Sequence, residues 1–188
     1  MKIAENYYKI ECSRPSDIHQ HLPTLKRYSE LCEHITEMGV RDIVSSWAFM
    51  VAGPKKLISY DISDPPANRL GKLKEAALEL NVDFKFIKAN VLSIDIEPTD
   101  LLFIDTLHRG TQLQNELLLH SNKVNKYIIL HDTTTFYLNG EDDNHKPSIK
   151  EDGLGWALGE FLKDNQNWVI KEVFKNNNGL TVIEKIKG

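Results

Sequence analysis

Two short apolar runs, DLLFID at 100–105 and KYIILHD at 126–132, each end in ionisable side chains. Runs of this length are typical of strands that are buried on both faces of a parallel sheet. Because the carboxyl ends of parallel strands meet at one edge, we expect Asp105, His131 and Asp132 to converge there. Open α/β sheets bind their ligands at this edge.

The rest of the chain continues the alternation of strand and helix. Apolar periodicity predicts further strands within 35–41, 56–62 and 83–89, and helices over 22–35, 43–52, 67–80, 109–121 and 154–162. The β-α-β-α rhythm favours a parallel sheet with right-handed crossovers. Two final strands, 168–175 and 179–186, are joined by a short NNNG link, which predicts an antiparallel hairpin.

The chain length of 188 residues suits one domain, 1–188. Residues 1–34 form a predicted helical cover, and the polar segment 133–152 forms a predicted loop at the active edge. A net charge of -4 disfavours a nucleic-acid partner. No apolar stretch is long enough for a membrane span, and the two cysteines have no metal-binding spacing, so we expect a cytoplasmic protein.

Asp61 closes the second predicted strand, where an acidic side chain can bind both hydroxyls of a ribose; the alternative is a turn or helix-capping role. The turn after the first strand contains Gly39 but lacks G-x-G-x-x-G, which disfavours a dinucleotide. S-adenosylmethionine has a ribose, no phosphate and cationic groups. Glu37 suits those cationic groups, although it is equally well explained as a structural hydrogen-bond acceptor.

Asp105, His131 and Asp132 offer oxygen and nitrogen ligands without thiolates, which favours Mg²⁺, Mn²⁺ or Fe²⁺ over structural zinc. Each residue also has a structural explanation: the aspartates as helix caps and His131 as a hydrogen-bonded core residue. In the loop, we expect Glu141, Asp142, Asp143 and His145 to form a solvated surface.

Several segments together resemble the class I S-adenosylmethionine-dependent methyltransferases, in particular the branch of small-molecule and sugar O-methyltransferases. They are GVRDIVSSWAFM, KKLISYDI, LLFIDTLHRGTQLQNEL, KYIILHDT, GLGWALGEFL and NNNGLTVIEK. The resemblance implies a Rossmann-like α/β fold, with a seven-stranded sheet of order 3-2-1-4-5-7-6, strand 7 antiparallel and helices on both faces.

The same resemblance implies roles for particular residues. The cofactor site would contain Glu37, Gly39, Asp61, Asn90 and Asp105, with Asn90 where an acidic residue is common. Asp105 and Asp132 match metal ligands, and His108 matches a general base three residues beyond the first aspartate. His131 stands where a carboxylate is usual, which is a departure from the pattern.

These observations lead to a predicted function: methylation of a hydroxyl on a small acceptor such as a sugar, with S-adenosylmethionine as the donor and a divalent metal, Mg²⁺ or Mn²⁺, as an aid. Neutral His108 would take the hydroxyl proton. Two alternatives remain: a metal-dependent hydrolase or oxygenase, and a nucleoside-binding or partner-binding module without catalysis. The acceptor and the oligomeric state, including a homodimer, are left open.

Overall fold

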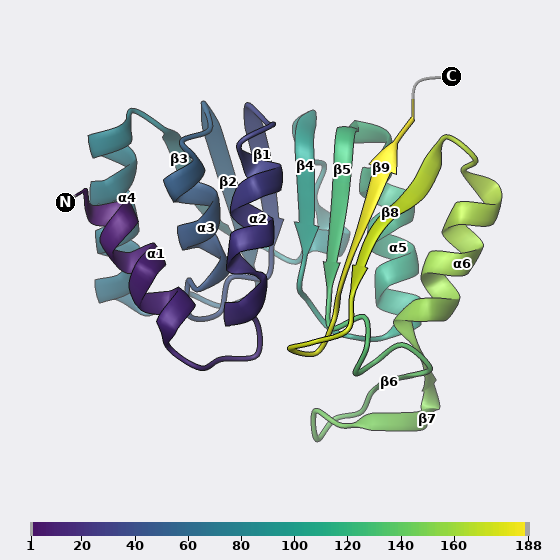
Figure 1. The fold of residues 1–188 in the computed structure, drawn as a ribbon. Helices are drawn as coiled ribbons and strands as arrows, with labels where there is room; N and C mark the ends of the chain where they lie inside the picture. Colours follow the sequence, from purple (N-terminus) through teal and green to yellow (C-terminus); the bar gives the residue numbers. More distant parts are fainter. Residues whose placement is uncertain (1, 187–188) are drawn as a thin grey trace.

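A seven-stranded sheet in the order β3-β2-β1-β4-β5-β9-β8 organises the structure (Figure 1). The computed structural model describes residues 2–186, so Met1, Lys187 and Gly188 of the predicted domain lie outside the described residues. The strands from β3 to β5 pair in parallel, and β9 is antiparallel to β5 and β8. The bounds are β1 His34–Met38, β2 Lys56–Asp61, β3 Asp83–Lys88, β4 Thr99–Ile104, β5 Val124–His131, β8 Trp168–Phe174 and β9 Leu180–Lys185.

This topology confirms the expected fold class. Counted within the main sheet alone, the order is the predicted 3-2-1-4-5-7-6. The labels of the last two strands differ because an additional two-stranded ribbon, formed by β6 (Asn139–Glu141) and β7 (Pro147–Asp152), precedes them in the chain.

Helices cover both faces of the sheet (Figure 1). One face packs against α2 (Leu22–Ser29), α3 (Ser45–Ala52) and α4 (Ala67–Leu80), and the other against α5 (Gly110–His120) and α6 (Leu154–Asp164). Helix α1 (Ile3–Ser13) packs on α3 and α4. Short 3₁₀ turns lie at His19–His21, Val91–Ser93 and Ser121–Lys123.

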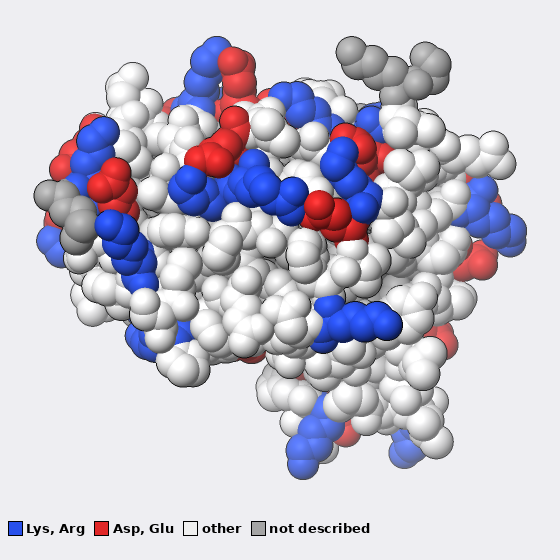
Figure 2. Space-filling view, in the orientation of Figure 1, with Lys and Arg blue, Asp and Glu red and all other residues white. Residues whose placement is uncertain are grey.

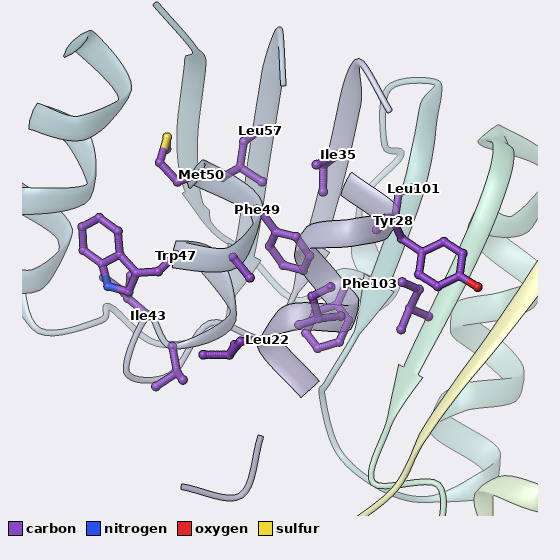
Figure 3. Close-up of a cluster of buried hydrophobic side chains, with 14 of the residues drawn as sticks. Leu22, Tyr28, Ile35, Ile43, Trp47, Phe49, Met50, Leu57, Leu101 and Phe103 are labelled. Atoms are coloured by element: carbon purple, nitrogen blue, oxygen red, sulfur yellow. The ribbon is translucent and has the colours of Figure 1, made fainter. Parts of the chain in front are cut away.

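Strand side chains alternate between two hydrophobic cores, because successive residues of a strand point to opposite faces. In β4, Leu101 and Phe103 pack with the first helical layer, whereas Leu102 and Ile104 pack with the second. Figure 3 shows the first core, where Phe49 of α3 lies against Phe103 with ring centroids 5.3 Å apart. Both faces of the central strands are therefore buried, which fixes the direction and register of their carboxyl ends.

The predicted helix over 22–35 is wrong at its C-terminal end. Helix α2 ends at Ser29, and Ile35 belongs to β1, where it pairs with Leu57 of β2 and Leu101 of β4. Ile35 is fully buried between these strands. Burial in the sheet thus overrides a helical period that continued by chance into a β-branched segment.

The predicted loop over 133–152 is also partly wrong, because it contains β6 and β7. The Asp142 carboxylate accepts hydrogen bonds from the backbone N–H groups of Asn144 and Lys146 and closes the turn between the two strands. The ribbon projects from the carboxyl edge of the sheet (Figure 1), and Ile149 on it is 90% exposed. The side chains of β7 are mostly exposed, and β6 buries a glycine and a glutamate, so the ribbon has no apolar period by which the sequence could reveal it.

Acidic and basic side chains are interspersed on the face shown in Figure 2. The ion pairs of the protein include Arg27–Glu172 and Lys26–Glu30. Within residues 2–186, no helix combines the length and the apolar character needed to cross a membrane.

Candidate active site

A cleft of about 620 Å³ lies at the carboxyl edge of the parallel strands. Its walls come mainly from the segments that follow β1, β2, β3 and β4, together with Glu141 at the end of β6 and His145 in the turn before β7. The predicted site residues Gly39, Asp61, Asn90, Asp105 and His108 all line this cleft. A volume of this size is within the range of small-molecule and cofactor sites.

Asp61, at the end of β2, is bound to the turn that follows β1. Its Oδ2 accepts hydrogen bonds from the backbone N–H groups of Val40 and Arg41 at 2.8 and 3.0 Å, and its Oδ1 accepts one from Ser63 N at 2.8 Å. The carboxylate is therefore held rigidly in the cleft wall, at the position that the sequence predicted for it.

Gly39 is required at its position by the approach of β4. Its φ is 88°, and a Cβ atom there would lie 1.8 Å from the carbonyl oxygen of Asp105. The following turn is strained, because Arg41 (φ 42°) and the buried Ile43 (φ 60°) also adopt the left-handed conformation, which is costly for a β-branched residue. Strain of this kind concentrates at ligand-binding turns.

Glu37 faces the protein interior and does not line the cleft. Its carboxylate accepts hydrogen bonds from the hydroxyls of Ser45, Ser46 and Ser59 at 2.6–3.0 Å and is fully buried. Burial raises its pKa to about 7, against the effect of the serine donors. The sequence allowed Glu37 either a contact with a cationic cofactor or a structural role as a hydrogen-bond acceptor. This geometry corresponds to the structural role, in which Glu37 joins β1 and β2 to the first turn of α3.

Asn90, which follows β3, is exposed and lines the cleft, and its side-chain oxygen accepts a hydrogen bond from Leu92 N at 3.0 Å. Beside Asp61, the cleft wall also contains Ile62, which is 70% exposed. This half of the cleft thus combines a carboxylate, an amide and an apolar surface.

The other half is lined by Asp105 and His108, which belong to a cluster of two aspartates and two histidines. The other two members, His131 and Asp132, are buried and do not line the cleft. Asp105, His131 and Asp132 present ligand atoms that all lie within 4.8 Å of one another, as a shared metal ion requires. His108 Nε2 lies 3.2 Å from Asp105 Oδ1 and 2.9 Å from Asp132 Oδ2. The other carboxylate oxygen of Asp132, Oδ1, is buried and has no hydrogen-bond partner, which fits a position beside a cation.

The cluster controls the ionisation of its own members. Burial by itself lowers the pKa of His108, but the hydrogen bonds that its ring donates to the Asp105 and Asp132 carboxylates, and the charges of those carboxylates, outweigh it and raise this pKa to about 10. Burial likewise opposes the charge of His131, yet the same two carboxylates hold its pKa well above 6.5. The metal-free His108 imidazole is therefore protonated at neutral pH, which differs from the neutral general base that the sequence predicted.

Two residues from the segment between β5 and β7 hold the His108 ring in place. Glu141 Oε2 lies 2.8 Å from His108 Nδ1, and the Phe136 ring stacks on the imidazole at 4.9 Å with an interplanar angle of 4°. The backbone of Glu141 also donates to His108 O at 2.8 Å. Glu141 is only 5% exposed, so its prediction as part of a solvated surface is wrong. Its place in the charged run GEDDN gave no local sign of burial.

The end of β5 is fixed by the C-terminal hairpin. Asp132 adopts a left-handed backbone conformation with φ 59°, and the next residue, Thr133, shares a hydrogen bond of 2.9 Å with Thr181 of β9. Thr134 N and Thr135 N both donate to Asn178 O. These contacts hold a strained aspartate where its carboxylate reaches the cluster.

Glu116 of α5 is a buried carboxylate near the same cluster. Its Oε1 accepts hydrogen bonds from Thr106 and Gln112, whereas Oε2 has no partner. Burial raises its pKa to about 7, which the two donors only partly offset. A carboxyl group with a raised pKa in the folded state stabilises the fold below its unfolded pKa, and this contribution is lost as the pH rises through about 7.

The substitution Glu116→Gln tests this prediction, because the amide stays neutral. We expect the stability of the variant, relative to wild type, to increase by about 3 kcal/mol between pH 4.5 and pH 8. Urea unfolding at several pH values measures the difference, and Glu75→Gln on the exposed side of α4 is the matched control. Parallel pH profiles for wild type and Glu116→Gln would contradict the assignment.

Comparisons with solved structures find proteins of the same fold. A putative caffeoyl-CoA O-methyltransferase from Staphylococcus aureus is 12% identical, with 97% of this chain and 90% of that chain covered and a TM-score of 0.58. A ribosomal protein L11 methylase from Lactobacillus delbrueckii subsp. bulgaricus is 16% identical over 90% and 80% of the two chains, with a TM-score of 0.60.

A third similar structure is the 1,6-didemethyltoxoflavin-N1-methyltransferase of Burkholderia thailandensis with bound S-adenosylhomocysteine, which is 12% identical over 92% and 79% of the chains, with a TM-score of 0.58. No protein-family model and no curated protein matches the sequence. At these identities the similarities establish the fold.

Proposed function

We propose that the protein is an S-adenosylmethionine-dependent methyltransferase that acts on a hydroxyl group of a small acceptor. One observation carries this proposal: a single cleft joins the half that contains Asp61 to the half that contains Asp105 and His108. A donor nucleoside and an acceptor bound in the two halves would be neighbours. In methyl transfer, alignment of the two reactants supplies much of the rate.

The nucleoside half has the chemistry that this donor needs. Asp61 is fixed by three backbone N–H groups and offers acceptor oxygens to ribose hydroxyls. Exposed Ile62 gives an apolar surface that a planar base would cover. The turn at Gly39 brings backbone close to the cleft without the glycine-rich loop that a pyrophosphate requires.

The acceptor half has the chemistry to hold and activate a hydroxyl. Asp105, His131 and Asp132 would hold a divalent cation, which supplies a lower pKa to a hydroxyl bound to it. In the reaction, the methyl carbon leaves the sulfonium sulfur, a C–O bond forms, and the hydroxyl proton passes to solvent water. The ribbon with Glu141 and His145 lines this half and would limit the size of the acceptor.

Calorimetry with S-adenosylhomocysteine tests the donor assignment. We expect wild type to bind the nucleoside and Asp61→Ala to bind it about 100-fold more weakly, because charge-assisted hydrogen bonds to two hydroxyls are lost. Asp64→Ala is the control, since Asp64 forms only an exposed ion pair with Lys88 nearby. If folded wild-type protein bound neither S-adenosylmethionine nor S-adenosylhomocysteine, the methyltransferase proposal would fail.

A further inference from the structure

Four ligand atoms in the acceptor half form a closed ring in which nitrogen and oxygen alternate. His108 Nε2 lies 3.2 Å from Asp105 Oδ1 and 2.9 Å from Asp132 Oδ2. His131 Nδ1 lies 3.2 Å from the same Asp105 oxygen and 3.3 Å from the same Asp132 oxygen. Each imidazole therefore lies between the same two carboxylate oxygens.

These separations are those of neighbouring ligands around one transition-metal ion. Metal–ligand bonds of about 2.0–2.2 Å, at angles between square and tetrahedral, place adjacent ligand atoms roughly 2.8–3.6 Å apart. All four distances between neighbouring atoms of the ring lie within this range. The ligand atoms that all lie within 4.8 Å of one another are those of Asp105, His131 and Asp132, so His108 would complete the set after a small shift of its ring. His108 thus stands at the same spacing from the two carboxylates as His131, which belongs to the predicted ligand set.

The surroundings of His108 are those of a metal-ligating histidine. Such a histidine usually has its second ring nitrogen hydrogen-bonded to a carboxylate, which fixes the tautomer and the ring orientation. Glu141 occupies this position at 2.8 Å from Nδ1 and is almost fully buried. Phe136 fixes the plane of the ring by stacking. Nε2 is left as the nitrogen directed at the cluster.

We propose that His108 is a ligand of the metal rather than the general base, so that the centre has two imidazole and two carboxylate ligands and prefers Mn²⁺, Fe²⁺, Co²⁺ or Zn²⁺ over Mg²⁺. Magnesium favours oxygen ligands, whereas imidazole suits the later divalent metals. The role of the centre in methyl transfer rests on the function proposed above. The ligand set itself is measurable without a methyl donor.

The test is metal binding by protein that has been stripped with a chelator. We expect calorimetry of wild type to give one bound Co²⁺ or Mn²⁺ per chain, at least about 100-fold tighter than Mg²⁺. His108→Ala is expected to bind Co²⁺ at least about 100-fold more weakly and to change the visible absorption spectrum of the bound cobalt. Glu141→Gln is expected to weaken binding about 10- to 100-fold through its effect on the ring.

His34→Ala is the control, because His34 lies at the amino end of β1, on the opposite edge of the sheet. Circular dichroism establishes that each variant is folded, and Glu141→Gln retains the test if His108→Ala does not fold. The proposal would be overturned if folded His108→Ala kept the cobalt spectrum and affinity of wild type. If His108→Ala does not fold, the same result in Glu141→Gln would overturn it. Equal affinity of wild type for Mg²⁺ and Mn²⁺ would also overturn it.

This outcome is separable from that of the proposed function. Nucleoside binding measured in chelator reports on the Asp61 half alone, and cobalt spectra report on the His108 half alone. If the protein binds the nucleoside but the cobalt spectrum is unchanged in the variants, the methyltransferase proposal stands and the proposed ligand set is rejected. If the metal binds as predicted but the nucleoside does not bind, the ligand set stands and the methyltransferase proposal is rejected.

Discussion

Replacing Gly39 with alanine is expected to destabilise the protein by at least about 3 kcal/mol and to abolish nucleoside binding. The added Cβ would lie 1.8 Å from the Asp105 carbonyl oxygen, and the φ of 88° is unfavourable for alanine. Neither backbone segment is free to move, because Asp105 N donates to Met38 O and Gly39 N donates to Tyr60 O. The clash therefore has to separate β1 from β4 at the site.

A second glycine provides the control for this experiment. Gly71 lies within α4, and a Cβ atom there would meet no other atom within 4 Å. Gly71→Ala is therefore expected to stabilise the protein by about 1 kcal/mol through helix propensity. Urea unfolding measures both variants. Equal stabilities of the two would show that the close approach at Gly39 does not exist in solution.

Asp105→Asn is expected to reduce the unfolding free energy of the metal-free protein by about 3–5 kcal/mol. Asp105 Oδ1 is the shared partner of His108 and His131, so the amide leaves two buried imidazolium groups with too little negative charge. Asp143→Asn, which changes a 97% exposed side chain paired with Arg109, is the control and should cost less than about 1 kcal/mol.

The effect of Asp105→Asn should depend on pH in a defined way. The folded-state pKa of His108 is raised to about 10, so its stabilisation is complete below 6.5 and is lost as the pH rises through about 10. The pKa of Asp105 is lowered, so its contribution is present above 3.8 and is lost in acid. The difference between wild type and variant should be largest between about pH 4 and 6.5. A difference that did not change with pH would exclude this charge cluster.

The parts of the fold that the sequence predicted well are those in which burial repeats with a regular period. Helix α4 has the predicted limits, and β4 and β5 pair in parallel, so that Asp105 and Asp132 meet as expected. The convergence of these residues follows from topology alone. The polar residues of a buried strand lie at its end, where the chain leaves the core. Adjacent parallel strands have their carboxyl ends on the same side of the sheet, so these polar residues lie close together.

The parts that the sequence did not predict depend on contacts between distant residues. Glu141 is 33 residues from His108, and nothing in its charged neighbourhood distinguishes it from Asp142 or Asp143. The ionisation of His108 depends on where Asp132 lies, which no local pattern contains. Glu37 is similar: its three serine partners come from α3 and β2, so the choice between ligand contact and structural role required coordinates.

The attachment of the β5 terminus to the C-terminal hairpin has a consequence for synthesis on the ribosome. His131 pairs with Leu180, and residues 133–135 are anchored to Asn178 and Thr181. A nascent chain that has exposed β4 and β5 but not yet β9 lacks the groups that hold Asp132 in its strained conformation. Completion of this edge is thereby delayed until β9 has been synthesised, whereas all residues of α1–α4 and of β1, β2 and β3 are available much earlier.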